Sequence, residues 1–249
     1  MDLGLTGSGA LVTGGSRGIG RSVAIALAAE GARVALLGRD PGALAAAAQV
    51  VGAGTVAVRA DTTHDDEVRA AVDEAAAQLG GLAVVVNCAA PRATPGQQPG
   101  LAGLDDADFL RQVDTKALGY VRVTRAAVPH LRAAGGGRVV NVSGMNARGT
   151  GSITGSVRNI AVVALTKNLA DELGSDGISV TCVHPGLTVT ERTAGDAAFQ
   201  EQASGNALRR PVTAGNVAAV IAFLASPLAA VANGAVVTLD GGRPGPIWA

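Results

Sequence analysis

Aromatic side chains and lysines are scarce in this sequence. Its 249 residues include one tyrosine, one tryptophan and three phenylalanines, although 48% of all residues are hydrophobic. That fraction supplies ample apolar side chains for a buried core. Tyr120 is the only tyrosine, and Lys116 and Lys167 are the only lysines. Chemistry that needs a phenol or an amine is therefore restricted to very few positions.

An excess of charge is also lacking, because twenty basic residues balance twenty acidic ones. This balance argues against nucleic acid or an anionic membrane surface as the main partner. The two cysteines, Cys88 and Cys182, lie in apolar runs, which fits a reducing cytoplasm better than a disulfide framework. The first eight residues have neither the basic nor the apolar region of a secretory signal. We therefore expect a cytoplasmic protein, and we predict no metal site.

A membrane span is not predicted either. The longest uncharged stretch covers residues 213–239. Pro227 and Gly234 would break a helix there, so we expect a helix, a loop and a strand instead.

Short apolar runs alternate with longer amphipathic stretches along the whole chain. The runs predict strands and the stretches predict helices, an order typical of a parallel sheet. We expect a single α/β domain over residues 1–249, with a doubly wound Rossmann sheet of about seven strands and helices on both faces. The expected strands are 10–13, 34–37, 56–58, 82–87, 139–142, 179–183 and 235–239. The expected helices are 19–29, 41–51, 65–79, 106–134, 156–173 and 213–225.

Two long loops interrupt this alternation. Residues 91–103 are rich in proline, glycine and glutamine, which fits either a mobile loop near the mouth of a cleft or a plain surface insertion. Residues 188–210 follow a strand end, and their length and polarity predict a flexible lid. Phe199 is the only aromatic residue in that lid, so its sequence does not identify a substrate.

The first predicted strand runs into a glycine-rich turn, Thr13–Gly20, and a helix follows it. Glycines at 14, 18 and 20 permit a tight turn, a close approach to a pyrophosphate and close packing of the helix on the strand. The start of the helix presents free N–H groups and the positive end of its dipole to phosphates. This context predicts a dinucleotide site with contacts from Gly14, Ser16, Arg17, Gly18, Ile19 and Gly20.

The end of the second strand indicates which dinucleotide is bound. NAD-binding proteins place an acidic residue there to hold the ribose 2′-OH. This chain has Gly38-Arg39 instead, and Arg17 stands in the glycine turn. Two guanidinium groups suit a 2′-phosphate, so we predict NADP(H). The alternative is that Arg39 is only a solvated loop charge.

Several further motifs complete a pattern that resembles the short-chain dehydrogenase/reductase family over nearly the whole chain. They are Asp61-Thr62, Asn87-Cys88-Ala89-Ala90, Asn141-Val142-Ser143, Leu165-Thr166-Lys167, Pro185-Gly186 with Thr190, and Asp240-Gly241-Gly242. The resemblance implies an NADP(H)-dependent oxidoreductase. It also implies cofactor contacts from Asp61, Thr62, Asn87, Ala89, Asn159, Pro185, Gly186, Thr188 and Thr190.

The same resemblance implies a catalytic serine, an asparagine, a tyrosine and a lysine four residues after the tyrosine. Only the serine has a match, at Ser143. Counting back from Leu165–Lys167 puts the tyrosine position at Gly155 and the lysine position at Asn159, and the asparagine position falls on Asp114. No tyrosine or lysine lies between Ser143 and Thr166, so the loss of this pair does not depend on the alignment.

The missing tyrosine would protonate the alkoxide that hydride transfer leaves, and the missing ammonium would lower its pKa. Because positioned proton transfer is worth about 10²–10⁴-fold, we expect weak, altered or absent ketone reduction. His184 lies at a strand end on the side expected for the nicotinamide, which makes it a candidate substitute acid. The alternative, which we favour, is a packed structural histidine.

Two functions therefore stay open. The first is an oxidoreductase with a rearranged proton path, which the retained cofactor turn favours. The second is a non-catalytic cofactor-binding subunit that pairs with an active paralogue. The family assembles through the helices expected at 106–134 and 156–173, and both keep apolar faces. We therefore expect a homo-oligomer or a hetero-oligomer with a short-chain dehydrogenase paralogue, with Ile247-Trp248 at a subunit contact.

Overall fold

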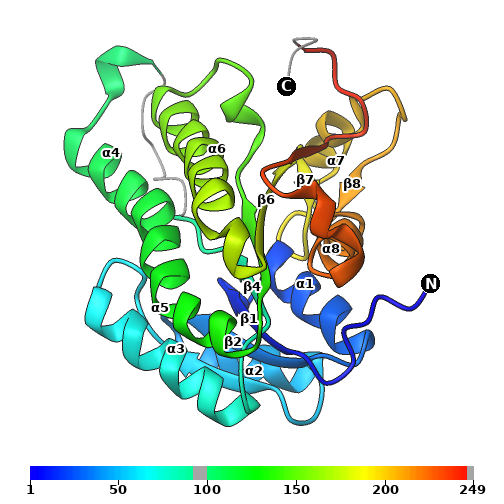
Figure 1. Cartoon of the computed structure of the whole chain (residues 1–249). Coiled ribbons are helices and arrows are strands. Elements are labelled where there is room, and N and C mark those ends of the chain that lie inside the picture. The colour runs from blue at the N-terminus through cyan, green and yellow to red at the C-terminus, as the bar shows by residue number, and fades with distance from the viewer. Residues whose placement is uncertain (92–99, 246–249) are drawn as a thin grey trace.

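The protein is described by a computed structural model that covers residues 1–91 and 100–245. Seven parallel strands form one sheet in the order β3-β2-β1-β4-β5-β6-β9, with the sheet between two layers of helices (Figure 1). The strands are β1 Gly9–Thr13, β2 Arg33–Gly38, β3 Val56–Arg59, β4 Val84–Asn87, β5 Gly137–Val142, β6 Ile178–Pro185 and β9 Val236–Leu239. The predicted fold class is confirmed.

Successive side chains of the central strand point into different cores, because strand side chains alternate between the two faces of a sheet. Val12 packs in one core with helices α1, α2 and α8, and Leu11 packs in the other with α3, α5 and the end of α6. The helices are α1 Gly18–Ala29, α2 Pro41–Val51, α3 Asp65–Leu79, α4 Asp106–Val113, α5 Gly119–Ala133, α6 Ile153–Leu173, α7 Ala197–Ser204 and α8 Ala214–Leu224. Short 3₁₀ turns cover Leu101–Gly103, Met145–Ala147, Gly174–Asp176 and Pro227–Ala232.

The helix expected at 106–134 is interrupted. Between α4 and α5 the chain makes one π-helical turn, η2 (Asp114–Leu118). A π-helical turn closes with i→i+5 hydrogen bonds, so the side chains after it face other directions than in a regular helix. The single regular helix of the prediction was therefore wrong at this point.

Two other predicted boundaries also change. Helix α6 begins at Ile153 rather than at residue 156, because the Ser152 side chain accepts a hydrogen bond from the Gly155 N–H at 3.0 Å and caps the helix start. The segment expected to be a lid contains helix α7, and its strand β7 (Thr188–Val189) pairs with β8 (Val212–Thr213). The loop predicted at 91–103 falls mostly on 92–99, which lie outside the described residues, as does the predicted contact at Ile247-Trp248.

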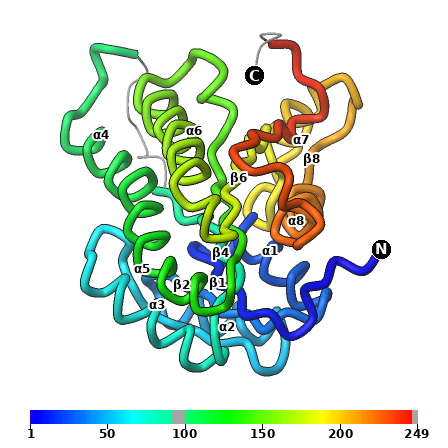
Figure 2. The backbone as a smooth tube through the Cα atoms, in the orientation of Figure 1, coloured from blue at the N-terminus to red at the C-terminus, as the bar shows by residue number. Residues whose placement is uncertain are grey.

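Two separate groups of elements cover the carboxyl edge of the sheet. Helices α4 and α6 lie side by side over one part of it, and the segment with α7 and β8 covers another part (Figure 2). In the part of the chain that the structure describes, no helix combines the length and apolar character needed to cross a bilayer.

Candidate active site

A cavity of about 930 Å³ opens where the strands β1 to β6 end. Its volume lies within the range of about 300–1,000 Å³ that is usual for ligand pockets. Most of the predicted cofactor residues line it, namely Gly14, Ser16, Arg17, Ile19, Gly20, Arg39, Asp61, Thr62, Ala89, Pro185, Gly186, Thr188 and Thr190. The catalytic candidate Ser143 lines it as well.

Three predicted cofactor residues, Gly18, Asn87 and Asn159, are not part of this lining. The Asn87 amide is fully buried and donates to Asn141 Oδ1 at 2.9 Å and to Thr124 Oγ1 at 3.3 Å. The Asn87 side chain therefore links β4 to β5 and to α5.

The conformation and close packing of the glycine turn depend on its glycines. Gly14 and Gly18 have φ values of +64° and +55°, a conformation that favours glycine. A Cβ on Gly20 would lie 2.4 Å from the carbonyl oxygen of Gly14. Behind the turn, Thr13 Oγ1 accepts the N–H groups of Cys88 and Ala89, both at 3.1 Å, and holds the end of β4 in place.

A carboxylate side chain of the protein itself, that of Glu191, binds at the start of α1. The Gly18 N–H donates to Glu191 Oε1 at 2.8 Å, and Arg21 lies 3.5 Å from the other oxygen of that carboxylate. This arrangement is expected at a helix N-terminus, where unpaired N–H groups and the dipole favour negative charge.

The two arginines predicted to hold a 2′-phosphate both line the cavity. Arg39 is 65% exposed, and its guanidinium lies 3.6 Å from Asp61 Oδ2. Asp61 is held in turn by the N–H and hydroxyl of Thr63, at 3.0 and 2.9 Å. Arg39 therefore lines the cavity while most of its surface stays in contact with solvent.

Lys116 is the residue that the sequence analysis did not assign to the site. Its Nζ donates to the carbonyl oxygen of Ser143 at 2.9 Å and to Asn159 Oδ1 at 2.8 Å. The side chain is 4% exposed and borders the cavity. Burial, followed by repulsion from Arg158, lowers the pKa of Lys116 to about 7. The only sequence signal for it was the scarcity of lysine.

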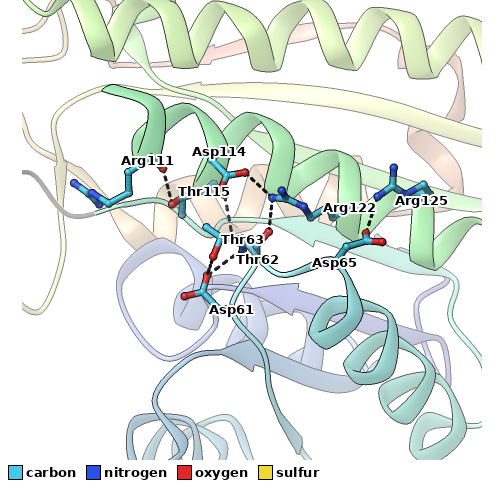
Figure 3. A network of polar contacts seen from close by, with 9 residues as sticks. All are labelled: Asp61, Thr62, Thr63, Asp65, Arg111, Asp114, Thr115, Arg122 and Arg125. Atoms are coloured by element: carbon cyan, nitrogen blue, oxygen red, sulfur yellow. Dashed lines mark hydrogen bonds and ion pairs between the residues drawn. The ribbon is translucent and has the colours of Figure 1, made fainter. Parts of the chain in front are cut away.

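The π-helical turn that carries Lys116 is fastened to the loop after β3 (Figure 3). The Thr62 hydroxyl donates to the carbonyl oxygen of Thr115 at 3.2 Å, and Arg122 donates to the Thr62 carbonyl at 3.0 Å. Gly119 permits this approach, because a Cβ there would lie 3.0 Å from the Thr62 side chain. Contacts of Thr62 with residues before and after Lys116 therefore hold the turn that carries this lysine.

Asp114, which we expected at the asparagine position, does not reach the site. Its carboxylate pairs with Arg122 at 2.8 Å, on the side of the turn that faces the β3 loop (Figure 3). Lys116, two residues further on, points to Ser143 instead. The resemblance assigns a position in the sequence and not the direction of a side chain, and within this turn the side chains of Asp114 and Lys116 have different partners.

The positions predicted for the missing tyrosine and lysine, 155 and 159, carry no side chain that could serve as the acid. Gly155 has no side chain, and Asn159 is 3% exposed, with its Oδ1 taken by Lys116. The Ser143 hydroxyl donates to the Asn159 carbonyl oxygen at 2.8 Å. Ser143 and Asn159 therefore hold the ammonium of Lys116 between them.

Two other proton-bearing side chains, His184 and Tyr120, are not part of the cavity lining. His184 is 2% exposed and is not part of the cavity lining; burial and then Arg148 lower its pKa to about 4. Tyr120 is 1% exposed and donates to the Val142 carbonyl oxygen at 2.9 Å, and burial raises its pKa well above the usual value. Both positions favour structural roles.

Comparisons with known proteins agree with the geometry. A family model described as enoyl-(acyl carrier protein) reductase matches residues 14–243. The short-chain reductase protein NovJ of Streptomyces niveus is 34% identical over 248 residues, which cover 94% of this chain and 93% of NovJ. The chain belongs to the short-chain dehydrogenase/reductase family.

Solved structures of short-chain dehydrogenases/reductases superpose over almost the full chain. One from Burkholderia cenocepacia J2315, in complex with NADP, is 34% identical with a TM-score of 0.82, and the match covers 96% of this chain and 98% of that one. L-Sorbose reductase from Gluconobacter frateurii, complexed with NADPH and L-sorbose, is 26% identical with a TM-score of 0.87, and the match covers 98% of both chains. The family and fold are thus established.

Proposed function

We propose that this chain is an NADP(H)-dependent oxidoreductase in which Lys116 handles the proton that a tyrosine handles in the family pattern. One observation carries the proposal: a buried lysine reaches Ser143 and Asn159, where the resemblance implies the catalytic groups. Relatives whose structures contain NADP or NADPH support the choice of cofactor.

The residues present fit NADP(H). Gly14, Ser16 and Gly20 of the glycine turn line the cavity, as do Arg17 in the same turn and Arg39 after β2. Guanidinium groups there match a 2′-phosphate better than a 2′-hydroxyl. When bound, the cofactor supplies or accepts a hydride.

Lys116 moves the proton at the substrate oxygen. In reduction, an N–H bond of its ammonium breaks and the proton goes to the alkoxide oxygen; the neutral amine then regains a proton from water. In oxidation, the neutral amine takes the proton from the alcohol. A pKa of about 7 populates both forms near neutral pH, which is the condition for efficient acid–base catalysis. Ser143 and Asn159 orient the amine for this transfer.

Replacing Lys116 with Met tests the proposal. We expect kcat/KM for NADPH-dependent reduction across a panel of ketones and aldehydes to fall by about 10²–10⁴-fold, with the Kd for NADPH unchanged. The inflection near pH 7 in the rate should disappear as well. Lys167→Met is the matched control, because Lys167 is 62% exposed and pairs with Asp171 on the surface. Full activity in Lys116→Met would contradict the proposal.

A second candidate function, the cofactor-binding subunit, is favoured by exposed apolar side chains on neighbouring helices. They are Leu110 on α4, Leu118 at the end of the π-helical turn, and Ile153, Val157 and Ile160 on α6, with exposures of 40–65%. Such a surface fits assembly with another short-chain dehydrogenase chain or with a second copy. This candidate predicts NADPH binding but no turnover by the isolated chain, in the wild type and in Lys116→Met alike.

A further inference from the structure

A chain of polar contacts crosses from α4 to α6 at the Ser143 end of the cavity. The Asp108 carboxylate accepts from Arg111 and from the Gln112 amide, and Gln112 Oε1 accepts from Arg158. Asp108 is 9% exposed and is the one carboxylate in this chain of contacts. Asp108 therefore contacts the Arg111 guanidinium directly and the Arg158 guanidinium only through Gln112.

Positive charge is in excess at this end. Arg111, Lys116 and Arg158 border the cavity here, and the carboxylates in its lining, Asp40 and Asp61, follow β2 and β3 at the opposite end. Burial, and then repulsion from Arg158, lowers the pKa of Lys116.

Arg158 is the least satisfied of these cations. Its guanidinium carries five N–H groups, but it makes one hydrogen bond, from Nη1 to Gln112, and its buried Nε has no partner among the described residues. Burial lowers the pKa of Arg158, which means that the charge is partly desolvated. A desolvated guanidinium gains most from an anion that accepts several of its N–H groups.

We infer that the substrate carries an anionic group, a carboxylate or a phosphate, that binds Arg158 while Lys116 faces the reacting oxygen. This inference rests on the proposed function, since it assigns a substrate class to the same cavity. It also couples binding to chemistry: an anion on Arg158 weakens the repulsion felt by Lys116, so the amine takes up a proton when the substrate binds.

The test measures binding, not turnover, with the NADP⁺-saturated protein. Two matched probe pairs are titrated by calorimetry: acetoacetate against methyl acetoacetate, and dihydroxyacetone phosphate against dihydroxyacetone. We expect one anion to bind at least about 10-fold more tightly than its neutral partner, and the pair that shows this tells carboxylate from phosphate. Titration at pH 8 in two buffers of different ionisation enthalpy should show proton uptake on binding.

Arg158→Gln should abolish the anion preference, Arg158→Lys should keep part of it, and the exposed Arg69→Gln on α3 should keep all of it. Equal affinity for acids and neutral partners, or a preference that survives Arg158→Gln, would overturn the inference and leave Lys116-dependent turnover untouched. Arg158-dependent anion binding without any turnover of NADPH would support the anion site and remove the proposed oxidoreductase activity.

Discussion

The ammonium of Lys116 donates to Asn159 Oδ1 at 2.8 Å, across 43 positions of the sequence. The two residues lie on neighbouring parts of the fold: one on the π-helical turn before α5, the other on α6. The family resemblance predicts a lysine position at Asn159. An amine from another helix therefore reaches the residue at this predicted position.

The stability of the protein should depend on the titration of Lys116. Its folded-state pKa of about 7 lies below the unfolded value of about 10.4. Below pH 7 both states are protonated and the folded state bears the full cost of the buried charge. Between pH 7 and 10 the unfolded state binds more protons, so the free energy of unfolding rises with pH, by up to about 1.4 kcal/mol per unit.

Lys116→Met should lack this rise. Urea unfolding of both proteins at pH 7, 8, 9 and 10 gives the difference in free energy of unfolding, in which the titration of all other groups cancels. We expect the free energy of unfolding of the wild type to rise relative to that of Lys116→Met as the pH increases. Lys167→Met should show the same pH dependence as the wild type. A constant difference across this range would show that the Lys116 amine has an ordinary pKa.

The preference for NADPH over NADH should depend on Arg39. Its guanidinium lines the cavity after β2, and a charge-assisted hydrogen bond to a 2′-phosphate is worth about 1.5–3 kcal/mol, or roughly 10–100-fold in Kd. Arg39→Ala should therefore weaken NADPH by that factor and leave NADH nearly unchanged, as measured by cofactor fluorescence. Arg69→Ala is the control. Equal affinities of the wild-type protein for the two cofactors would refute the preference.

Restoring the family's catalytic pair requires more than two substitutions. A Cβ at Gly155 would lie 2.8 Å from Ser152 Oγ, so Gly155→Tyr needs Ser152→Gly beside it. Asn159→Lys would place a second ammonium against Lys116, so Lys116→Asn must accompany it. Replacing Asp114 should not raise the reductase activity, because its carboxylate pairs with Arg122.

This fourfold variant should raise NADPH-dependent reduction of neutral ketones by about 10²-fold or more over the wild type. Gly155→Tyr with Ser152→Gly alone should gain less, because a phenol without the ammonium keeps a pKa near ~10. Both variants are compared at equal cofactor saturation. A fourfold variant that binds NADPH and stays inert would mean that the cavity does not admit these ketones.

Assembly should depend on the exposed apolar face of α6. Val157 and Ile160 are 40% and 48% exposed, and a buried carboxylate at an interface costs several kcal/mol. Val157→Glu with Ile160→Glu should therefore shift the protein toward the monomer in sedimentation velocity at micromolar concentration. Val231→Glu, at a fully exposed position of another face, is the control. A wild-type monomer at these concentrations would contradict the expected oligomer.

The sequence by itself determined the fold class and the glycine turn. Apolar periodicity depends on which face of an element is buried, and a glycine at positive φ is a local steric requirement, so both can be predicted from neighbouring residues. The absence of a tyrosine and a lysine at positions 155 and 159 also followed from the sequence, because the region between Ser143 and Thr166 contains neither residue.

Only the tertiary structure decided which side chains lie beside Ser143 and Asn159. The family resemblance placed Asp114 at the asparagine position, but in the folded chain Asp114 pairs with Arg122 and the π-helical turn carries Lys116 to Ser143. The sequence left His184 open as an acid, whereas burial among β6 neighbours keeps that side chain neutral and away from the cavity. Hydrogen-bond partners and desolvation depend on contacts between elements far apart in the chain, and no local pattern of residues encodes those contacts.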